Sequence, residues 1–212
     1  MSPRASTRAA HRETSGAKER LLIAAAGVFR ECGYRAASLD EILRRSRVAK
    51  SNFYYHYSGK LELACETVDL WLYALGLTLL PHLSKAERSG LDRVRDFVAA
   101  FESECRDGPV GCPFGMLAAE EDLEEPLRAR VQHALDVTEE GVRKALETGV
   151  SDGSVRSGVD PATLAVAIVA AVQGGGLLGR ALGEPCRISD SVEPVLGLIQ
   201  GPGPDAPPRQ GR

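Results

Sequence analysis

Residues 38–57, SLDEILRRSRVAKSNFYYHY, decide the fold of the N-terminal part of this chain. Ser38 followed by Glu41 forms a capping box, which predicts that a short helix begins just after Ser38. A tight turn at residues 47–49 would separate this helix from a second short helix over residues 50–56. Two short helices joined by such a turn are typical of a helix-turn-helix.

A longer amphipathic helix is expected just before this pair. Residues 17–32 place Leu21, Val28 and Phe29 on one face, at helical spacings. Gly33 follows at the position where a glycine commonly ends a helix. The sequence therefore predicts a third helix on which the helix-turn-helix pair can pack.

The aromatic side chains of the second short helix are expected to divide between two faces. Phe53 and Tyr57 are four residues apart, so they share a face that can pack on the preceding helices. Tyr54, Tyr55 and His56 must then point largely elsewhere, where their polar groups can bond phosphates. The alternative is that the tyrosines only brace the helix that follows.

Charge is distributed unevenly along the chain. Residues 1–60 carry twelve Lys and Arg against five Asp and Glu, whereas residues 61–212 carry fourteen against twenty-four. The two parts, about +7 and about −10, give the net charge of −3. A basic first third on an acidic remainder favours a polyanionic partner for the N-terminal part, although a solvated charged face would look the same.

Residues 33–63, GYRAASLDEILRRSRVAKSNFYYHYSGKLEL, resemble the DNA-binding domain of the tetracycline-repressor (TetR) family of regulators. The resemblance implies that Lys50 and Ser51 face bases from the start of the recognition helix, with Asn52 in the same exposed first turn. It implies phosphate contacts from these side chains: Ser38, Tyr54, Tyr55, His56 and Lys60.

Two positions depart from the usual pattern of that family. Arg47 stands where glycine is common in the turn, so it must take an unfavourable φ or remodel the turn, and it would add a DNA contact. Ala49 stands where a serine or threonine often caps the recognition helix, so that cap is expected to be missing or supplied differently.

The whole chain is predicted to be all-α, with about nine helices in two parts. Helical patterns continue over residues 60–80, 91–106, 116–123, 125–149, 162–182 and 188–200, with a loop at 108–115. The expected organisation is a disordered basic arm over 1–16, a helix-turn-helix domain over 17–62, a ligand-binding and dimerisation domain over 63–200, and a disordered tail over 201–212.

The apolar helix near the C-terminus has two interpretations. Residues 162–179 carry no charge over a borderline transmembrane length, but Thr163, Gln173 and three consecutive glycines weaken a membrane span. A tightly buried helix at a subunit interface fits better, and the family resemblance implies a homodimer built on the two C-terminal helices. We therefore expect no membrane partner.

The family resemblance also implies a small-molecule site in the second part of the chain. The candidate lining residues are Trp71, Tyr73, Leu75, Phe97, Phe101, Cys112, Met116 and His133. Few of them ionise, which favours an apolar or weakly polar ligand, and plain core packing is the alternative for each. No cofactor and no metal site are expected, because the five cysteines show no CxxC pair.

The cysteines offer a second hypothesis for sensing. Residues 111–120, GCPFGMLAAE, resemble a GC-x-x-G-x-L-x-x-E pattern at the start of the sixth helix in a subgroup of the family, some of whose members sense electrophiles or oxidants. Cys112, before Pro113 at a helix start, would then be reactive through a lowered thiol pKa, with Cys105 as the other candidate. The alternative is an inert thiol.

Other function classes fit less well. Cys112 with His133 would imitate a nucleophile and base, but no oxyanion motif accompanies them, so an enzyme is not expected. An architectural DNA-binding protein would hardly need the long acidic second part. The sequence therefore favours a cytoplasmic, ligand-responsive DNA-binding regulator, most often a repressor that leaves a palindromic operator.

Overall fold

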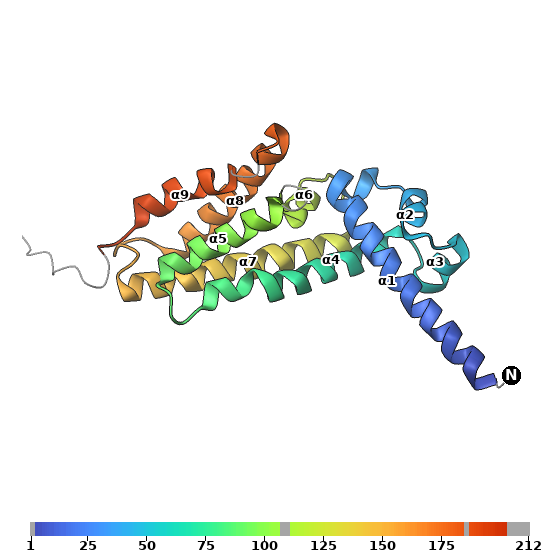
Figure 1. Ribbon diagram of the computed structural model, residues 1–212. Helices are drawn as coiled ribbons and strands as arrows, with labels where there is room; N and C mark the ends of the chain where they lie inside the picture. The colour runs from blue at the N-terminus through green and yellow to red at the C-terminus, as the bar shows by residue number, and fades with distance from the viewer. Residues whose placement is uncertain (1–2, 107–110, 185–186, 203–212) are drawn as a thin grey trace, which may run out of the picture. The chain divides into compact units, whose positions relative to one another are not determined.

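The structure is a computed structural model that describes residues 3–106, 111–184 and 187–202, with side chains from Gly16 onward (Figure 1). Nine α-helices and one 3₁₀ helix lie within these ranges, so the predicted all-α class is confirmed there. The helices are α1 (Pro3–Ala36), α2 (Leu39–Ser46), α3 (Lys50–His56), α4 (Lys60–Thr78), η1 (Leu80–Ser84), α5 (Gly90–Arg106), α6 (Pro113–Ala118), α7 (Glu125–Asp152), α8 (Pro161–Leu182) and α9 (Arg187–Ile199).

The chain forms two compact units, and the units do not follow the order of the sequence. Residues 1–71 and 116–132 make the first unit, and residues 72–115 and 133–212 make the second. Helices α4, α6 and α7 therefore contribute residues to both units. The first unit thus includes two segments, 63–71 and 116–132, that the sequence pattern assigns to the second domain.

Helix α1 begins at Pro3, whereas residues 1–16 were expected to be a disordered arm. Proline is favourable in the first turn of a helix, and the Ala and Arg residues that follow have high helix propensity. The other end matches the expectation, because Gly33 interrupts the helix with φ 80° and ψ 177°. The predicted disordered tail falls mostly on residues 203–212, outside the described residues.

The core of the first unit joins α1, α2 and α3 through fully buried side chains. Leu21 and Ile42 have no exposed surface, and neither does Phe53. Tyr57, just after α3, is also buried, and its ring centroid lies 5.7 Å from that of Phe53. Burial of these side chains is the main contribution to holding two helices as short as α2 and α3 in place.

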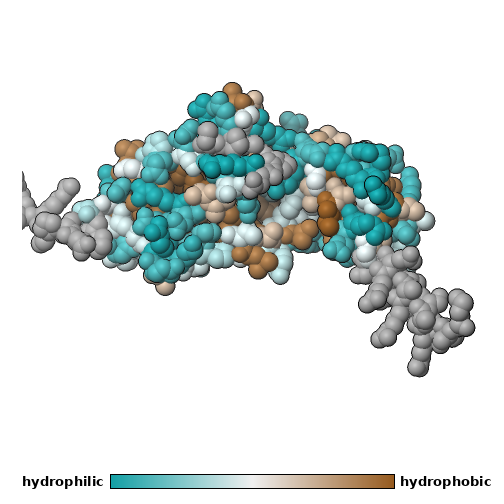
Figure 2. All heavy atoms as spheres, in the orientation of Figure 1, coloured by the Kyte–Doolittle hydropathy of each residue, from teal (hydrophilic) through white to brown (hydrophobic). Residues whose placement is uncertain are grey.

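The core of the second unit includes one apolar stripe from α5 and the packed pair α8 and α9. Phe97 and Phe101 of α5 are buried, as the periodicity predicts. A Cβ atom on Gly175 would lie 2.7 Å from the carbonyl oxygen of Arg187, so α8 and α9 approach through backbone atoms. On the face drawn in Figure 2, most residues are hydrophilic, and apolar residues are exposed in separate patches.

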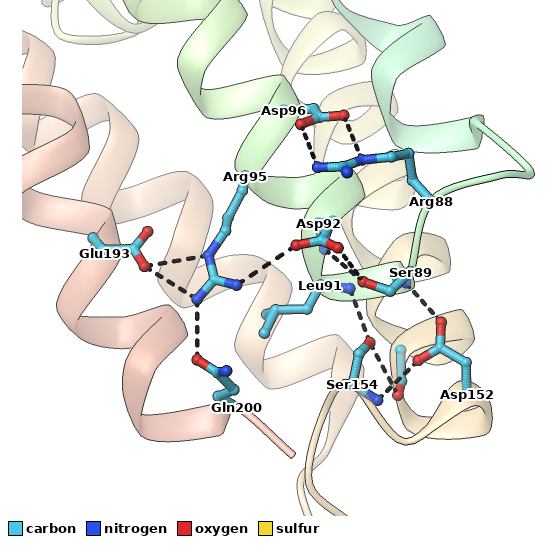
Figure 3. A network of polar contacts seen from close by, with 12 residues as sticks. Arg88, Ser89, Leu91, Asp92, Arg95, Asp96, Asp152, Ser154, Glu193 and Gln200 are labelled. Carbon is cyan, nitrogen blue, oxygen red and sulfur yellow. Dashed lines mark hydrogen bonds and ion pairs between the residues drawn. The ribbon is translucent and has the colours of Figure 1, made fainter. Parts of the chain in front are cut away.

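Polar contacts fix the start of α5 in the second unit (Figure 3). The amide of Gly90 donates to Oδ2 of Asp152 at 2.8 Å, and the amide of Leu91 donates to Oγ of Ser154 at 3.2 Å. Arg95, one turn later, donates to Oε1 of Glu193 on α9 at 3.1 Å. Ser89 caps α5 locally, since its Oγ accepts from the amide of Asp92 at 3.2 Å. Asp152 at the end of α7 and Ser154 just after it thus bind two further amides at the start of α5.

The short sixth helix was predicted over residues 116–123, and its start is wrong by three residues. Helix α6 runs from Pro113 to Ala118, because proline favours the first helical position. The helix ends at Ala118, five residues before the predicted end, and Asp122 in the segment that follows has a left-handed φ of 55° that a helix does not contain. The predicted loop therefore covers residues 111–112 among those described, and residues 107–110 lie outside them.

Candidate nucleic-acid interface

The helix-turn-helix forms where the sequence predicts it. Oγ of Ser38 accepts a hydrogen bond from the amide of Glu41 at 3.1 Å, which is the expected N-cap of α2. Arg47 ends α2 with φ 54° and ψ 36°, so a non-glycine residue occupies the left-handed conformation of the turn. Ala49 precedes α3 without any side-chain cap, as its chemistry dictates.

One face of α3 is open to solvent. Tyr54 is 54% exposed and Tyr55 is 73% exposed. Phe53, on the opposite face of α3, points into the core and has no exposed surface. The other exposed members of the first turn are Lys50, Ser51 and Asn52. This face presents an ammonium, an amide and hydroxyl groups, all of which can donate to phosphate oxygens or base edges.

His56 and Lys60, both predicted to contact phosphates, are half-buried in the structure. Nε2 of His56 is buried and has no hydrogen-bond partner among the described residues. Nζ of Lys60 donates to the carbonyl oxygens of Tyr34 and Ala37, at 2.9 Å each, and lies 4.4 Å from the centroid of the Tyr34 ring. Lys60 therefore binds carbonyl groups at the end of α1, which the helix leaves unpaired.

The basic side chains of α2 are neutralised locally. Arg45 binds Glu31 of α1 through two hydrogen bonds of 2.6 and 2.7 Å, and it also contacts Glu41. Hydrogen bonds from Arg44 and Arg45 lower the pKa of Glu41 to about 2. The exposed positive charge next to the turn is therefore smaller than the sequence count indicates.

The predicted ligand-binding residues are divided between the two units. Trp71 and Met116 belong to the first unit, whereas the remaining six belong to the second. Within the second unit Leu75, Phe97 and Phe101 are buried in the core, but Tyr73 and His133 are exposed. For the three buried residues, the alternative of plain core packing describes what the structure shows.

A groove of about 480 Å³ opens in the second unit between η1 and α7. Its apolar lining comes from Leu80, Leu83 and Val137, and Asp136 and His133 are among its polar residues. Only His133 belongs to the predicted set. The others were missed because residues about fifty positions apart carry no shared sequence pattern, although the apolar side of α7 was visible.

The two candidate sensing cysteines have different surroundings. Cys105 is buried, and its Sγ accepts a hydrogen bond from the amide of Gly111 at 3.5 Å. Cys112 is half-buried and directly precedes α6. The geometry leaves Cys112 as the more accessible thiol of the pair.

The last two helices expose large apolar side chains. On α8 and α9 these are Val166, Leu177, Leu178, Leu182 and Leu198. Helix α8 is long and apolar enough to cross a membrane, and 33% of its most apolar window is buried. Length and composition alone are weak evidence, since core and interface helices of soluble proteins pass the same test.

Comparison with known proteins places these features in one family. Residues 21–67 match the family "Bacterial regulatory proteins, tetR family", and residues 90–192 match "Tetracyclin repressor-like, C-terminal domain". The HTH-type transcriptional regulator LmrA of Bacillus subtilis is 29% identical over 147 residues, which cover 66% of this chain and 76% of LmrA.

A second curated relative and a solved structure are also similar to this chain. The HTH-type transcriptional repressor DhaR of Mycobacterium sp. is 26% identical over 148 residues, covering 69% of this chain and 74% of DhaR. A crystal structure of a TetR-family transcriptional regulator from Agrobacterium tumefaciens has a TM-score of 0.83 at 21% identity. The match covers 89% of this chain and 100% of the chain in that structure.

Proposed function

Because the chain belongs to the TetR family of DNA-binding transcriptional regulators, we propose that it is a repressor that releases its operator when a small molecule binds. The observation that carries the DNA-binding part is the solvent-facing side of α3, with Tyr54 and Tyr55 exposed beside Lys50. The name of DhaR, a transcriptional repressor, supports repression as the outcome. Such a protein acts in the cytoplasm, where the DNA is.

The DNA contacts proposed for this chain fall into two groups. Lys50, Ser51 and Asn52 read base edges from the first turn of α3, because they are exposed there. Tyr54 and Tyr55 bind phosphates with their hydroxyl groups. The supporting phosphate contacts come from Ser38, Arg47, His56 and Lys60. Of these, Lys60 has two of its three N–H donors already engaged, which leaves one for a phosphate.

A homodimer is the proposed assembly. A recognition helix of seven residues reads few base pairs, and a two-fold dimer on a palindrome doubles that number. The exposed apolar side chains of α8 and α9, such as Leu177 and Leu198, would be buried in the interface. Gel filtration with light scattering tests this step: Leu177→Glu with Leu198→Glu should give a monomer, and a monomeric wild-type protein would contradict it.

The effector is proposed to be a mainly apolar small molecule bound in the second unit. The groove between η1 and α7 supports this because Leu80, Leu83 and Val137 offer an apolar surface beside the polar His133 and Asp136. Thermal-shift screening of compounds on wild-type protein and on a Leu83→Asp variant tests the location. A compound that releases DNA from both proteins equally would place the site elsewhere.

Selection of DNA from a random pool tests the central proposal. A regulator yields one palindromic sequence and a single footprint, whereas an architectural protein protects DNA diffusely. Affinity for the selected operator should fall steeply with salt, with a log–log slope of roughly −0.9 per neutralised phosphate. Diffuse protection with no selected sequence would contradict the proposed function.

A thiol sensor is the second candidate, because Cys112 is half-buried at the start of α6, within reach of solvent. DNA release would be measured after an electrophile is added to the wild-type protein, to Cys112→Ser and to Cys105→Ser. Loss of the response in Cys112→Ser alone supports this mechanism, and unchanged release in both variants ends it.

A further inference from the structure

The segment between α6 and α7 holds the turn at the end of α1, within the first unit. Oε1 of Glu120 accepts from the amide of Tyr34 at 2.6 Å, and Oε2 accepts from the amide of Arg35 at 2.9 Å. Nη1 of Arg35 donates to the carbonyl of Glu121 at 3.0 Å, and the Tyr34 hydroxyl donates to Oε1 of Glu124 at 3.2 Å. The carboxylate of Glu120 therefore accepts hydrogen bonds from two adjacent backbone amides.

Gly33 makes this arrangement possible in two ways. Its φ of 80° interrupts α1, so the amides of Tyr34 and Arg35 begin a new turn and lose their helical acceptors. A Cβ atom on Gly33 would lie 2.2 Å from Oε1 of Glu120, so only glycine leaves room for the carboxylate. Lys60 binds the carbonyls of Tyr34 and Ala37, and the turn is therefore held through both kinds of backbone group.

Glu120 is also the last residue of the motif in residues 111–120. Three of its positions have structural roles: Gly111 has a left-handed φ of 104°, a Cβ atom on Gly115 would lie 2.0 Å from Oε1 of Gln173 on α8, and Leu117 is buried. Gly115 belongs to the second unit and Glu120 to the first, five residues later. The motif thus runs from a close contact with α8 to the carboxylate that holds α1.

We propose that Glu120 is a positioning residue for DNA binding. Its two hydrogen bonds fix the helix-turn-helix against the segment that continues into α7. Hydrogen bonds to an ionised carboxylate are stronger than neutral ones, and two parallel bonds fix an orientation as well as a distance. In the dimer this connection keeps the two recognition helices at one separation, which depends on the dimeric operator binding proposed above.

The test compares Glu120→Gln with Glu121→Gln. The first change keeps the side-chain size but replaces one acceptor oxygen by a donor. The second removes the same charge from the next residue, whose main-chain carbonyl, and not its carboxylate, contacts Arg35. Kd would be measured for the operator selected by the wild-type protein, and for the same half-sites moved two base pairs apart.

The expected result is a change in spacing preference. The ratio of the two affinities should fall about fivefold or more in Glu120→Gln, in the range of ordinary coupling between sites, and stay at the wild-type value in Glu121→Gln. A role limited to stabilising the fold would lower both affinities alike and leave the ratio unchanged. An unchanged ratio in Glu120→Gln, or an equal fall in both variants, would overturn the inference.

A measurement on the wild-type protein covers the case in which Glu120→Gln does not fold. Hydrogen exchange by NMR should show slow exchange at the amides of Tyr34 and Arg35, and fast exchange at both would overturn the inference. If the wild-type protein selects no palindrome, the proposed function falls and the inference falls with it. If it does select one, a failed spacing test counts against Glu120 alone.

Discussion

Helices α2 and α3 lie on either side of one tight turn, yet they are stabilised differently. Helix α2 has its own cap at Ser38, and the carboxylate of Glu41 binds the arginines of its last turn. Helix α3 begins after Ala49 with no side-chain cap and leaves Tyr54 and Tyr55 exposed. Helix α3 therefore depends on the burial of Phe53, while α2 uses local polar bonds.

The largest effect on DNA binding is expected from substitutions on the exposed face of α3. Lys50→Ala should weaken operator binding by about 1–3 kcal/mol and relax base preference, because it removes a base contact. Tyr55→Phe should weaken binding to all sequences alike, since phosphates carry no sequence information. Affinities for the operator and for single-base variants measure both effects.

Arg44→Ala on α2 is the matched control for Lys50→Ala. It removes the same charge, but Arg44 already binds Glu41 through two hydrogen bonds of 2.7 Å. Base preference should therefore be retained in Arg44→Ala. If Lys50→Ala left base preference untouched, the proposed register of α3 on the bases would be wrong.

The next effect concerns Lys60, which supports the first unit from inside. Lys60→Met should lower the free energy of unfolding by about 2 kcal/mol, because two carbonyl groups lose hydrogen bonds from a charged donor. Lys50→Met, at an exposed position, should change stability little. Urea unfolding followed by circular dichroism compares the two, and equal effects would contradict an internal role for Lys60.

The two helices can be compared directly by adding an N-cap to α3 and removing the N-cap of α2. Ala49→Ser should stabilise the protein by about 1 kcal/mol by giving α3 the cap that it lacks, whereas Ser38→Ala should cost about 1 kcal/mol by removing that of α2. Thermal unfolding measures both. A destabilising Ala49→Ser would show that the start of α3 cannot accept a side-chain cap.

The smallest effect is a pH dependence of the pairs on α2. The pKa of Glu41 is lowered to about 2, so its contribution is present above the ordinary value of 4.5 and is lost as pH falls from there toward 2. Because this carboxylate is exposed, the effect should be small. Glu41→Gln should flatten the acid limb of the stability curve, and an unaltered limb would show that these ion pairs do not contribute.

The predictable parts of the fold are those set by neighbours in sequence. The N-cap at Ser38, the left-handed turn at Arg47 and the buried spacing of Phe53 and Tyr57 all follow from residues within a few positions. The bonds of Lys60 to Tyr34 and Ala37 were not predictable, because these residues lie twenty-six and twenty-three positions away. Local periodicity carries no information about such pairs.

The second unit shows the same limit more strongly. The stripe of Phe97 and Phe101 on α5 was predictable from spacing, but Asp152, which binds the amide of Gly90 at the start of α5, lies sixty-two residues later. The groove likewise combines η1 with α7, so only His133 was named from sequence. Phe97 and Phe101, which the sequence also offered as ligand contacts, are buried in the core because they lie on the packed face of α5.

The placement of residues 116–132 in the first unit affects how the protein is made. The DNA-binding unit needs Glu120 and the buried Leu123 and Leu127, which a ribosome adds long after residue 71. At a synthesis rate of about 5–20 residues per second, residues 116–132 follow the helix-turn-helix only after several seconds. A nascent chain cannot complete its DNA-binding unit until residues 116–132 have been synthesised, so shorter chains should lack a complete unit.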